Sequence, residues 1–139
     1  NSFEASPATS ELKDAAIIVA GGGGCKTKDN YMKFIPALAD ALSAFLGEKA
    51  MAGASRVAVE RGFADRSHQV GQTGQTVKPK LYVAVGISGA VQHISGMQNS
   101  NIILAINKDP NANIFKTADF GIVGNLEEEI PKLIDILNS

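Results

Sequence analysis

Short apolar runs that alternate with helical patterns constrain the fold of this chain more than any other feature. Residues 15–20 (AAIIVA), 81–85 (LYVAV) and 102–106 (IILAI) are continuously apolar, which is typical of parallel strands buried on both faces. A helical period covers residues 31–45, and residues 86–96 predict a turn and a short helix. A strand, a helix and a strand in this order favour a right-handed parallel crossover. We therefore predict an α/β fold, in which helices cover both faces of an open, mainly parallel sheet.

The remaining elements are less sharply defined. Residues 49–52 predict a second short strand, and residues 53–61 predict a helix that opens on the segment GASR. Residues 69–79 carry glycine without a helical period and predict a loop. Residues 120–123 predict a further strand, before a last helix that ends near Leu137.

Two prolines leave the starts of their helices open. Pro36 lies inside the period of residues 31–45, so that helix either begins late, with proline in its first turn, or is kinked there. Asn125 and Glu128 have the spacing of a capping box, but Pro131 can instead occupy the first turn of a helix that begins later.

Charge and composition argue against several classes of function. The 13 basic and 14 acidic side chains nearly cancel, so nucleic acid is not an expected partner. One cysteine, Cys25, and two histidines, His68 and His93, are too few for a cysteine cluster or a closed zinc site, and we expect no metal. No apolar run approaches the roughly 20 residues that cross a bilayer, so we expect no direct membrane insertion.

The chain is predicted to hold one domain behind a tether. Residues 1–12 are mainly small and polar, and we interpret them as a linker from a missing upstream domain, whose loss would have removed any targeting segment. Residues 13–139 then form the domain, because a chain of 139 residues with 45% hydrophobic residues can bury one core.

The turn of residues 86–89 (GISG) is the main candidate for a phosphate site. Ligands of open parallel sheets bind outside the carboxyl ends of the strands, where this turn lies. Glycine lets a ligand approach the backbone, and the helix amino terminus and Ser88 offer donors to a pyrophosphate. A tight turn that needs glycine only for its backbone angles is the alternative. Residues 21–24 (GGGG) could also cradle phosphate, but Lys26 and Thr27 follow too early for a P-loop.

Five ordered motifs together carry a family resemblance. They are GASR (residues 53–56), QVGQTG (69–74), LYVAVGISGAVQHISGM (81–97), AINKDPNANIF (105–115) and ADFGIVG (118–124). From about residue 15 to residue 137 the chain resembles, in register, the carboxyl-terminal FAD-binding domain of the electron transfer flavoprotein alpha family. The resemblance implies a Rossmann-like FAD- or NAD-binding fold.

The resemblance also implies roles around the flavin ring. Arg56 would lie over the isoalloxazine, where a permanent positive charge favours a ring that turns anionic on taking up one electron. Ser55 would contact the flavin or its ribityl chain. Gln72 and Thr73 would hydrogen-bond the reactive edge of the ring, and His93 would donate to a carbonyl of its pyrimidine part.

The rest of the cofactor is assigned in the same way. The turn of residues 86–89, Ser88 above all, would hold the pyrophosphate. Asn107 and Lys108 carry over to the diphosphate and ribose, and Asp119 and Phe120 to the adenosine end. The complete predicted cofactor set is Ser55, Arg56, Gln69, Val70, Gly71, Gln72, Thr73, Gly86, Ile87, Ser88, Gly89, Gln92, His93, Asn107, Lys108, Asp109, Asp119 and Phe120.

The function that the resemblance implies is electron transport, without a catalytic residue or a substrate of its own. FAD would take electrons from acyl-CoA and other dehydrogenases, as in fatty acid beta-oxidation, and deliver them to a membrane-bound quinone oxidoreductase. The implied partner is the beta subunit, and the implied compartment is the mitochondrial matrix, or the cytoplasm of a bacterium. Two rivals are an NAD-binding enzyme domain, with His93 as its one clear acid or base, and a cofactor-free interaction domain.

Two departures from the family pattern stand out. The family commonly has arginine in its first glycine loop (GGRG), where this chain has Gly23. The segment of residues 46–51 before GASR is a few residues longer than usual, which would lengthen a loop at a partner surface. Neither departure removes a predicted flavin contact.

Overall fold

The computed structural model describes residues 12–71 and 74–139, and the predicted linker and the pair Gln72 and Thr73 fall wholly or almost wholly outside that part. Its centre is a five-stranded sheet in the order β2-β1-β3-β4-β5, in which every neighbouring pair is parallel. The strands are β1 (Ile17–Gly21), β2 (Ala50–Ala54), β3 (Leu81–Val85), β4 (Ile102–Asn107) and β5 (Phe120–Val123). The α/β prediction is confirmed.

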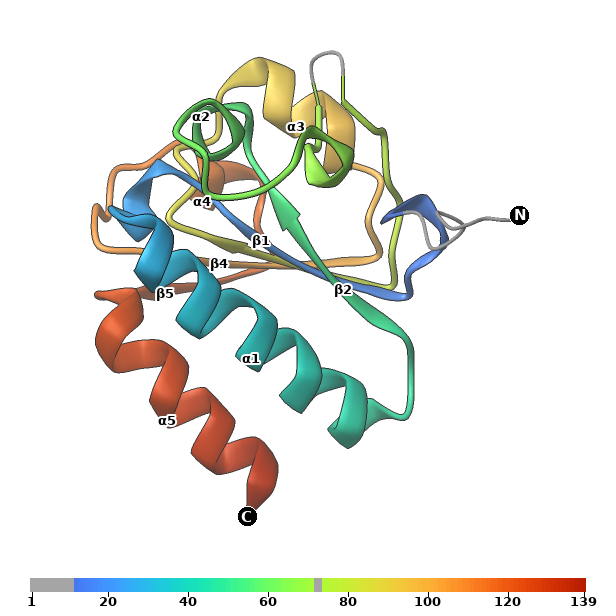
Figure 1. Cartoon of the computed structure of the whole chain (residues 1–139), viewed down its shortest axis with the longest axis vertical. Coiled ribbons are helices and arrows are strands. Elements are labelled where there is room, and N and C mark those ends of the chain that lie inside the picture. Colours follow the sequence, from blue (N-terminus) through green and yellow to red (C-terminus); the bar gives the residue numbers. More distant parts are fainter. Residues whose placement is uncertain (1–11, 72–73) are drawn as a thin grey trace.

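Helices cover both faces of this sheet (Figure 1). The helices are α1 (Lys28–Leu46), α2 (Arg56–Glu60), α3 (Val91–Met97), α4 (Ile114–Thr117) and α5 (Leu126–Asn138). Short 3-10 turns lie at Leu12–Asp14, Gly23–Cys25 and Arg66–His68. Helices α1 and α5 pack side by side on one face, α3 and α4 lie on the other, and α2 lies beyond the carboxyl end of β2 (Figure 1).

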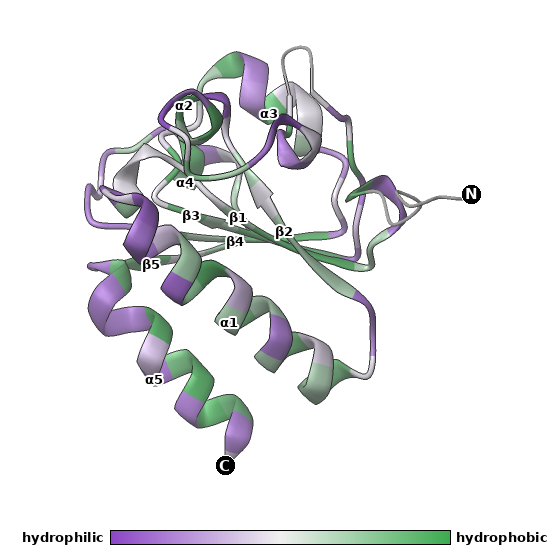
Figure 2. Ribbon diagram, in the orientation of Figure 1, coloured by the Kyte–Doolittle hydropathy of each residue, from purple (hydrophilic) through white to green (hydrophobic). Residues whose placement is uncertain are grey.

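The strands feed two cores because their side chains alternate between the faces. Ile17 and Val19 pack towards α1 and α5, whereas Ile18 and Ala20 pack towards α3 and α4. All five positions of β1 are buried, which explains why its sequence is continuously apolar. In Figure 2 the central strands are mainly hydrophobic, whereas α1 and α5 alternate hydrophobic and hydrophilic stretches, as expected of helices with one face on the sheet.

Two helix boundaries differ from the sequence prediction, and a third was left open by the sequence. Helix α1 begins at Lys28 rather than near residue 31, because the Thr27 hydroxyl accepts from the Asn30 N–H at 3.1 Å and caps it. Pro36 therefore lies in the helix interior. Helix α5 begins directly after Asn125, which is the earlier of the two starts that the sequence left open, and it contains Pro131.

The segment GASR is the second boundary that differs. Gly53 and Ala54 belong to β2, paired with Ala20 and Gly21, and helix α2 begins only at Arg56. Ser55 marks the boundary, since its hydroxyl accepts from the Ala58 N–H at 3.2 Å. Helix α4 was not predicted, because a single turn is too short to give a helical period.

Candidate functional site

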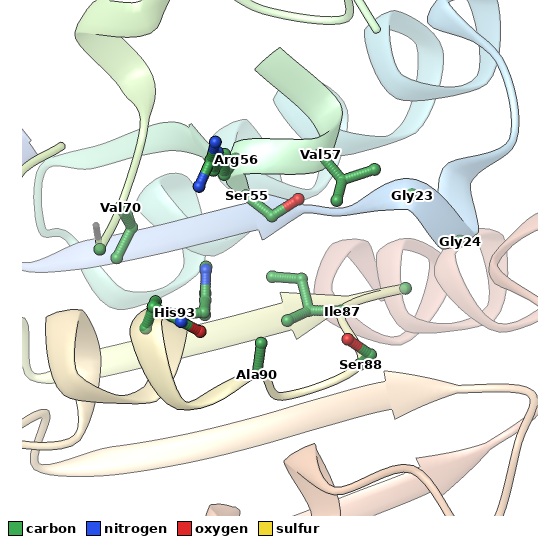
Figure 3. A pocket seen from close by; sticks show the side chains of 13 residues that line it. Gly23, Gly24, Ser55, Arg56, Val57, Val70, Ile87, Ser88, Ala90 and His93 are labelled. Carbon is green, nitrogen blue, oxygen red and sulfur yellow. The ribbon is translucent and has the colours of Figure 1, made fainter. Parts of the chain in front are cut away.

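A cavity of about 280 Å³ opens at the carboxyl ends of the strands, between the loops that follow β1 and β3 (Figure 3). The strand order 2-1-3-4-5 has its switch point between these two strands, which is where doubly wound sheets bind ligands. The residues that line it are Gly23, Gly24, Ser55, Arg56, Val57, Val70, Gly71, Gly86, Ile87, Ser88, Ala90, Gln92 and His93.

Two groups of these residues face each other across the cavity (Figure 3). We call Ser55, Arg56 and Val57, which lie at the start of α2, the α2 wall. We call the segment from Gly86 to His93, which runs from the end of β3 into α3, the α3 wall. The glycine loop after β1 closes one end of the cavity, and Val70 and Gly71 close the other (Figure 3).

The glycines at the first end are needed for packing between two loops. The Gly24 N–H donates to the Gly86 carbonyl at 2.9 Å. A Cβ on Gly24 would meet the Gly86 Cα at 2.6 Å, and a Cβ on Gly22 would meet the Gly86 carbonyl at 2.6 Å. Gly86 itself has φ of 65°, a left-handed angle that favours glycine. Gly86 is therefore needed for its backbone angle, as the alternative predicts, and the turn also borders the cavity.

Ser88 and Gly89 have different roles in the GISG turn. The Ser88 side chain is exposed and lines both the cavity and an adjoining recess of about 400 Å³. Gly89 does not line the cavity. Its φ is 96°, and a Cβ there would meet the Ile114 nitrogen at 2.4 Å, so this glycine lets α4 pack against the turn.

The α2 wall places a charge at an exposed edge of the cavity. The Arg56 Nε donates to the Glu60 carboxylate at 3.0 Å, and both side chains are more than half exposed. Ser55 is buried, and its N–H donates to the Gly21 carbonyl at 3.0 Å, which ties the start of α2 to the end of β1. Arg56 is thus held at the mouth by its neighbour in the helix while the backbone beneath it is fixed.

The α3 wall contains a buried histidine. His93 is 6% exposed, and burial lowers its pKa to about 4, so the imidazole is neutral at pH 7. Its Nε2 lies 2.8 Å from the Tyr82 hydroxyl of β3, and its Nδ1 is buried without a hydrogen-bond partner among the described residues. Since buried polar atoms are nearly always paired, this nitrogen is a place where a ligand is expected to contribute the partner.

The loop before β3, which contains Val70 and Gly71, closes the second end of the cavity. The Val70 N–H donates to the Ala54 carbonyl at 2.9 Å, which holds the loop to the edge strand β2. Gly71 has φ of 80°, and a Cβ there would meet the Gln92 carbonyl at 2.3 Å, so only glycine allows this loop to touch α3. Gln69 is buried but does not line the cavity, and the predicted roles of Gln72 and Thr73 concern residues outside the described part.

Three further predicted residues extend the site along the sheet edge. Asn107 ends β4, and its side-chain amide donates to the Ile87 carbonyl at 3.0 Å. Asn107 and Asp109 line the recess that Ser88 shares, and Lys108 lines a smaller one of about 40 Å³ beside it. The structure therefore brings these residues next to the GISG turn.

Asp119 and Phe120 are not brought to this edge. Strand β5 begins at Phe120 and runs parallel to β4, so the amino end of β5 lies at the opposite edge of the sheet. The Asp119 carboxylate accepts from the Ile103 N–H at 2.8 Å, which fastens it to the beginning of β4. We therefore leave both residues out of the proposed site.

Several lining residues were missed from the sequence. Four residues of the cavity are not in the predicted cofactor set: Gly23, Gly24, Val57 and Ala90. For the two glycines the sequence indicated only a possible phosphate cradle. Beyond the carboxyl end of β5, the recess that contains Lys108 is lined by four consecutive residues, Gly124, Asn125, Leu126 and Glu127. The rule that ligands lie at carboxyl ends of strands, applied to residues 120–123, would have pointed to this segment rather than to Asp119.

The fold and the site define the chain as a domain of the doubly wound α/β class, with a cavity at the switch point of its sheet. A model of the family described as "Electron transfer flavoprotein FAD-binding domain" matches residues 11–98. The chain is 53% identical over 124 residues to the electron transfer flavoprotein subunit alpha of Thermoanaerobacterium thermosaccharolyticum, covering 89% of this chain and 36% of that protein. It belongs to the family of electron transfer flavoprotein FAD-binding domains.

Similarity extends to eukaryotic relatives. A probable mitochondrial electron transfer flavoprotein subunit alpha of Cryptococcus neoformans var. grubii is 51% identical over 129 residues, which is 93% of this chain and 36% of that protein. The corresponding subunit of Bradyrhizobium diazoefficiens is 51% identical over 123 residues, covering 88% and 37%. The chain thus spans about a third of the length of the relatives it matches.

The described residues include no helix that is both long and apolar enough to cross a membrane. In the same part of the chain, no three side chains of His, Cys, Asp or Glu gather so that they could hold a metal ion.

Proposed function

We propose that this domain binds FAD in the cavity between the α2 and α3 walls and serves as the cofactor domain of an electron carrier. The observation that carries the proposal is the Nδ1 of His93, which is buried at the switch point of the sheet without a partner among the described residues, in a chain whose family is described as FAD-binding. A flavin fits these residues because its pyrimidine half carries carbonyl acceptors and its pyrophosphate suits the open backbone beside Ser88.

Different residues of the chain contact different parts of the cofactor. His93 contacts the pyrimidine part of the ring from the α3 wall. Arg56 places its charge beside the ring from the α2 wall, where bulk water is displaced once the ligand is in place. The GISG turn and Ser88 hold the pyrophosphate, and Asn107 and Lys108 lie where the chain of the cofactor continues along the sheet edge. Bound FAD itself supplies the redox chemistry.

The partners follow from the family and are part of the same proposal. The domain would pack with an electron transfer flavoprotein beta subunit, accept electrons from acyl-CoA and other dehydrogenases, and pass them to a membrane-bound quinone oxidoreductase. We place the carrier in fatty acid beta-oxidation, in the mitochondrial matrix of a eukaryote or the cytoplasm of a bacterium. Named relatives from both kinds of organism support these two options.

Equilibrium dialysis of the 139-residue chain against FAD and against NAD tests the proposal. We expect saturable uptake of one FAD with its visible flavin absorbance, and no saturable uptake of NAD. Uptake of NAD alone would favour the rival NAD-binding enzyme domain. A chain that takes up neither nucleotide would refute cofactor binding by this domain.

A further inference from the structure

The buried pair of Tyr82 and His93 carries an inference about the α3 wall. Tyr82 is fully buried in the centre of the sheet, and its hydroxyl lies 2.8 Å from the His93 Nε2. The two rings meet edge to face, with centroids 6.0 Å apart and planes at 63°. The Tyr82 hydroxyl therefore lies beside a ring nitrogen of His93, which can donate or accept a hydrogen bond.

Both groups are neutral over the physiological range. Burial raises the pKa of the Tyr82 hydroxyl well above its usual value of 10.0, so it keeps its proton. Burial also lowers the pKa of His93 to about 4, so the ring carries one hydrogen, on either Nδ1 or Nε2. The hydrogen bond between the two side chains decides which.

Counting buried hydrogen-bonding groups distinguishes the two arrangements. If the Tyr82 hydroxyl accepted from an Nε2–H, its own hydrogen would be buried without an acceptor among the described residues, and the Nδ1 lone pair would also be unpaired. If the hydroxyl donates to Nε2, the Nδ1–H is the one group of this pair that lacks a partner within the described part of the chain. Each unpaired buried polar group costs about 1 to 3 kcal/mol, so the second arrangement is favoured.

We infer that Tyr82 is a positioning residue: its hydroxyl donates to the His93 Nε2, holds the imidazole in the Nδ1–H form, and so fixes a neutral hydrogen-bond donor in the cavity wall. This inference rests on the proposed function for the identity of the ligand, whose acceptor atom is a carbonyl oxygen of the flavin. It extends that function because Tyr82, which does not line the cavity, makes His93 recognise a hydrogen-bond acceptor rather than a donor or a cation.

The hydrogen positions can be read directly by NMR. The chain has two histidines, so 15N-labelled histidine gives two ring systems, which His68→Gln assigns. We expect the His93 ring to be protonated at Nδ1 in the FAD-free protein and to remain so when FAD is added. His68 gives an internal reference for this form, because its Nδ1 lies 2.7 Å from the Ala52 carbonyl, which can only accept.

Tyr82→Phe removes the hydroxyl and leaves the aromatic packing. We expect His93 to lose its preference for the Nδ1–H form and the Kd for FAD to rise about three- to tenfold. The matched control is Tyr31→Phe, because Tyr31 is a second buried tyrosine whose hydroxyl donates to the Gly53 carbonyl at 2.7 Å, away from His93. This control should leave the His93 ring and the FAD affinity unchanged.

Two results would overturn the inference. One is a wild-type His93 ring that is protonated at Nε2 or divided between both forms. This measurement uses the wild-type chain, so it does not depend on whether a variant folds. The other is a Tyr82→Phe protein that keeps both the Nδ1–H form and the wild-type affinity. If no version of the chain binds FAD, the proposed function fails, while the ring spectra still decide the role of Tyr82.

Discussion

The α2 wall and the α3 wall of the cavity differ in the charge and the burial of their polar side chains. The α3 wall holds its polar group, His93, buried and neutral, next to a tyrosine that lies inside the core. The α2 wall holds its polar group, Arg56, charged and more than half exposed, beside a carboxylate one helical turn away. A buried group with one fixed partner suits recognition of a ligand, whereas an exposed charge suits adjustment of the electrostatics of a ligand that is already bound.

The comparison predicts first that His93 makes stability depend on pH. Its pKa is about 4 in the folded chain against 6.5 in the unfolded chain, so the unfolded state binds more protons between these values. The free energy of unfolding should therefore fall as the pH drops from 6.5 through 4, by about 3 kcal/mol at most from this residue. Denaturant unfolding of wild type and His93→Gln, measured at several pH values, gives the difference.

The matched control for that series is His68→Gln, which leaves His93 in place and should keep the acid loss of the wild type. The carboxyl groups of the chain contribute equally to all three proteins, so only the difference between them is informative. A His93→Gln protein that loses stability with the wild-type slope would contradict a buried, neutral α3 wall.

The second prediction concerns the Ser88→Leu variant of the α3 wall. A leucine side chain would fill the place where the cavity and its neighbouring recess meet, so we expect the Kd for FAD to rise more than about 100-fold. Ser95→Leu, an exposed serine later in α3, is the control and should bind normally. Normal affinity in the Ser88→Leu protein, measured by fluorescence titration, would move the phosphate site elsewhere.

The third prediction places the smaller effects on the α2 wall. Arg56→Ala should bind FAD nearly as well as the wild type but lower the potential of the first electron by roughly 40 to 130 mV, the equivalent of about 1 to 3 kcal/mol. The reason is that the guanidinium interacts more strongly with an anionic ring than with a neutral one. Arg56→Lys should recover part of the shift, since an ammonium keeps the charge but cannot stack. A reductive titration with optical detection measures the potential.

Glu60→Gln is the counterpart within the same ion pair. Because it removes a negative charge beside Arg56, it should raise that potential, and by less than Arg56→Ala lowers it, since exposed pairs are weak. An Arg56→Ala protein that holds FAD with an unchanged first potential would make the arginine structural and would erase the proposed difference between the walls.

Much of the fold could be predicted because the central strands β1 and β3 are buried on both faces. Residues 81–85 were predicted at their observed bounds, since a continuous apolar run with clear ends has few alternatives. The predicted bounds of residues 120–123 also match, although β5 is a largely exposed edge strand. The starts of α1 and α5 could not be predicted, because apolar packing of the helices holds Pro36 and Pro131 in helix interiors that local propensity disfavours.

Site residues could be predicted where they belong to a sequence motif. They could not be predicted where a contact depends on how two elements pack. His93 and the first three residues of the GISG turn were predicted from the sequence, and they line the cavity. The pairing of His93 with Tyr82 depends on how α3 lies against β3, which a sequence pattern does not contain. Asp119 lies at the opposite edge of the sheet because it precedes β5, and the ADFGIVG motif does not itself show which end of the strand reaches the site.

The most direct test of the central claim, that the cavity between the two walls is an FAD site, is a thermal melt of the chain at increasing FAD concentration. A ligand that binds only the folded state stabilises it by RT ln(1 + [L]/Kd), or about 2.7 kcal/mol at about 100 times Kd. We expect the melting temperature to rise with FAD in the wild type and to stay constant in Ser88→Leu. A wild-type melt that is indifferent to saturating FAD would contradict the account.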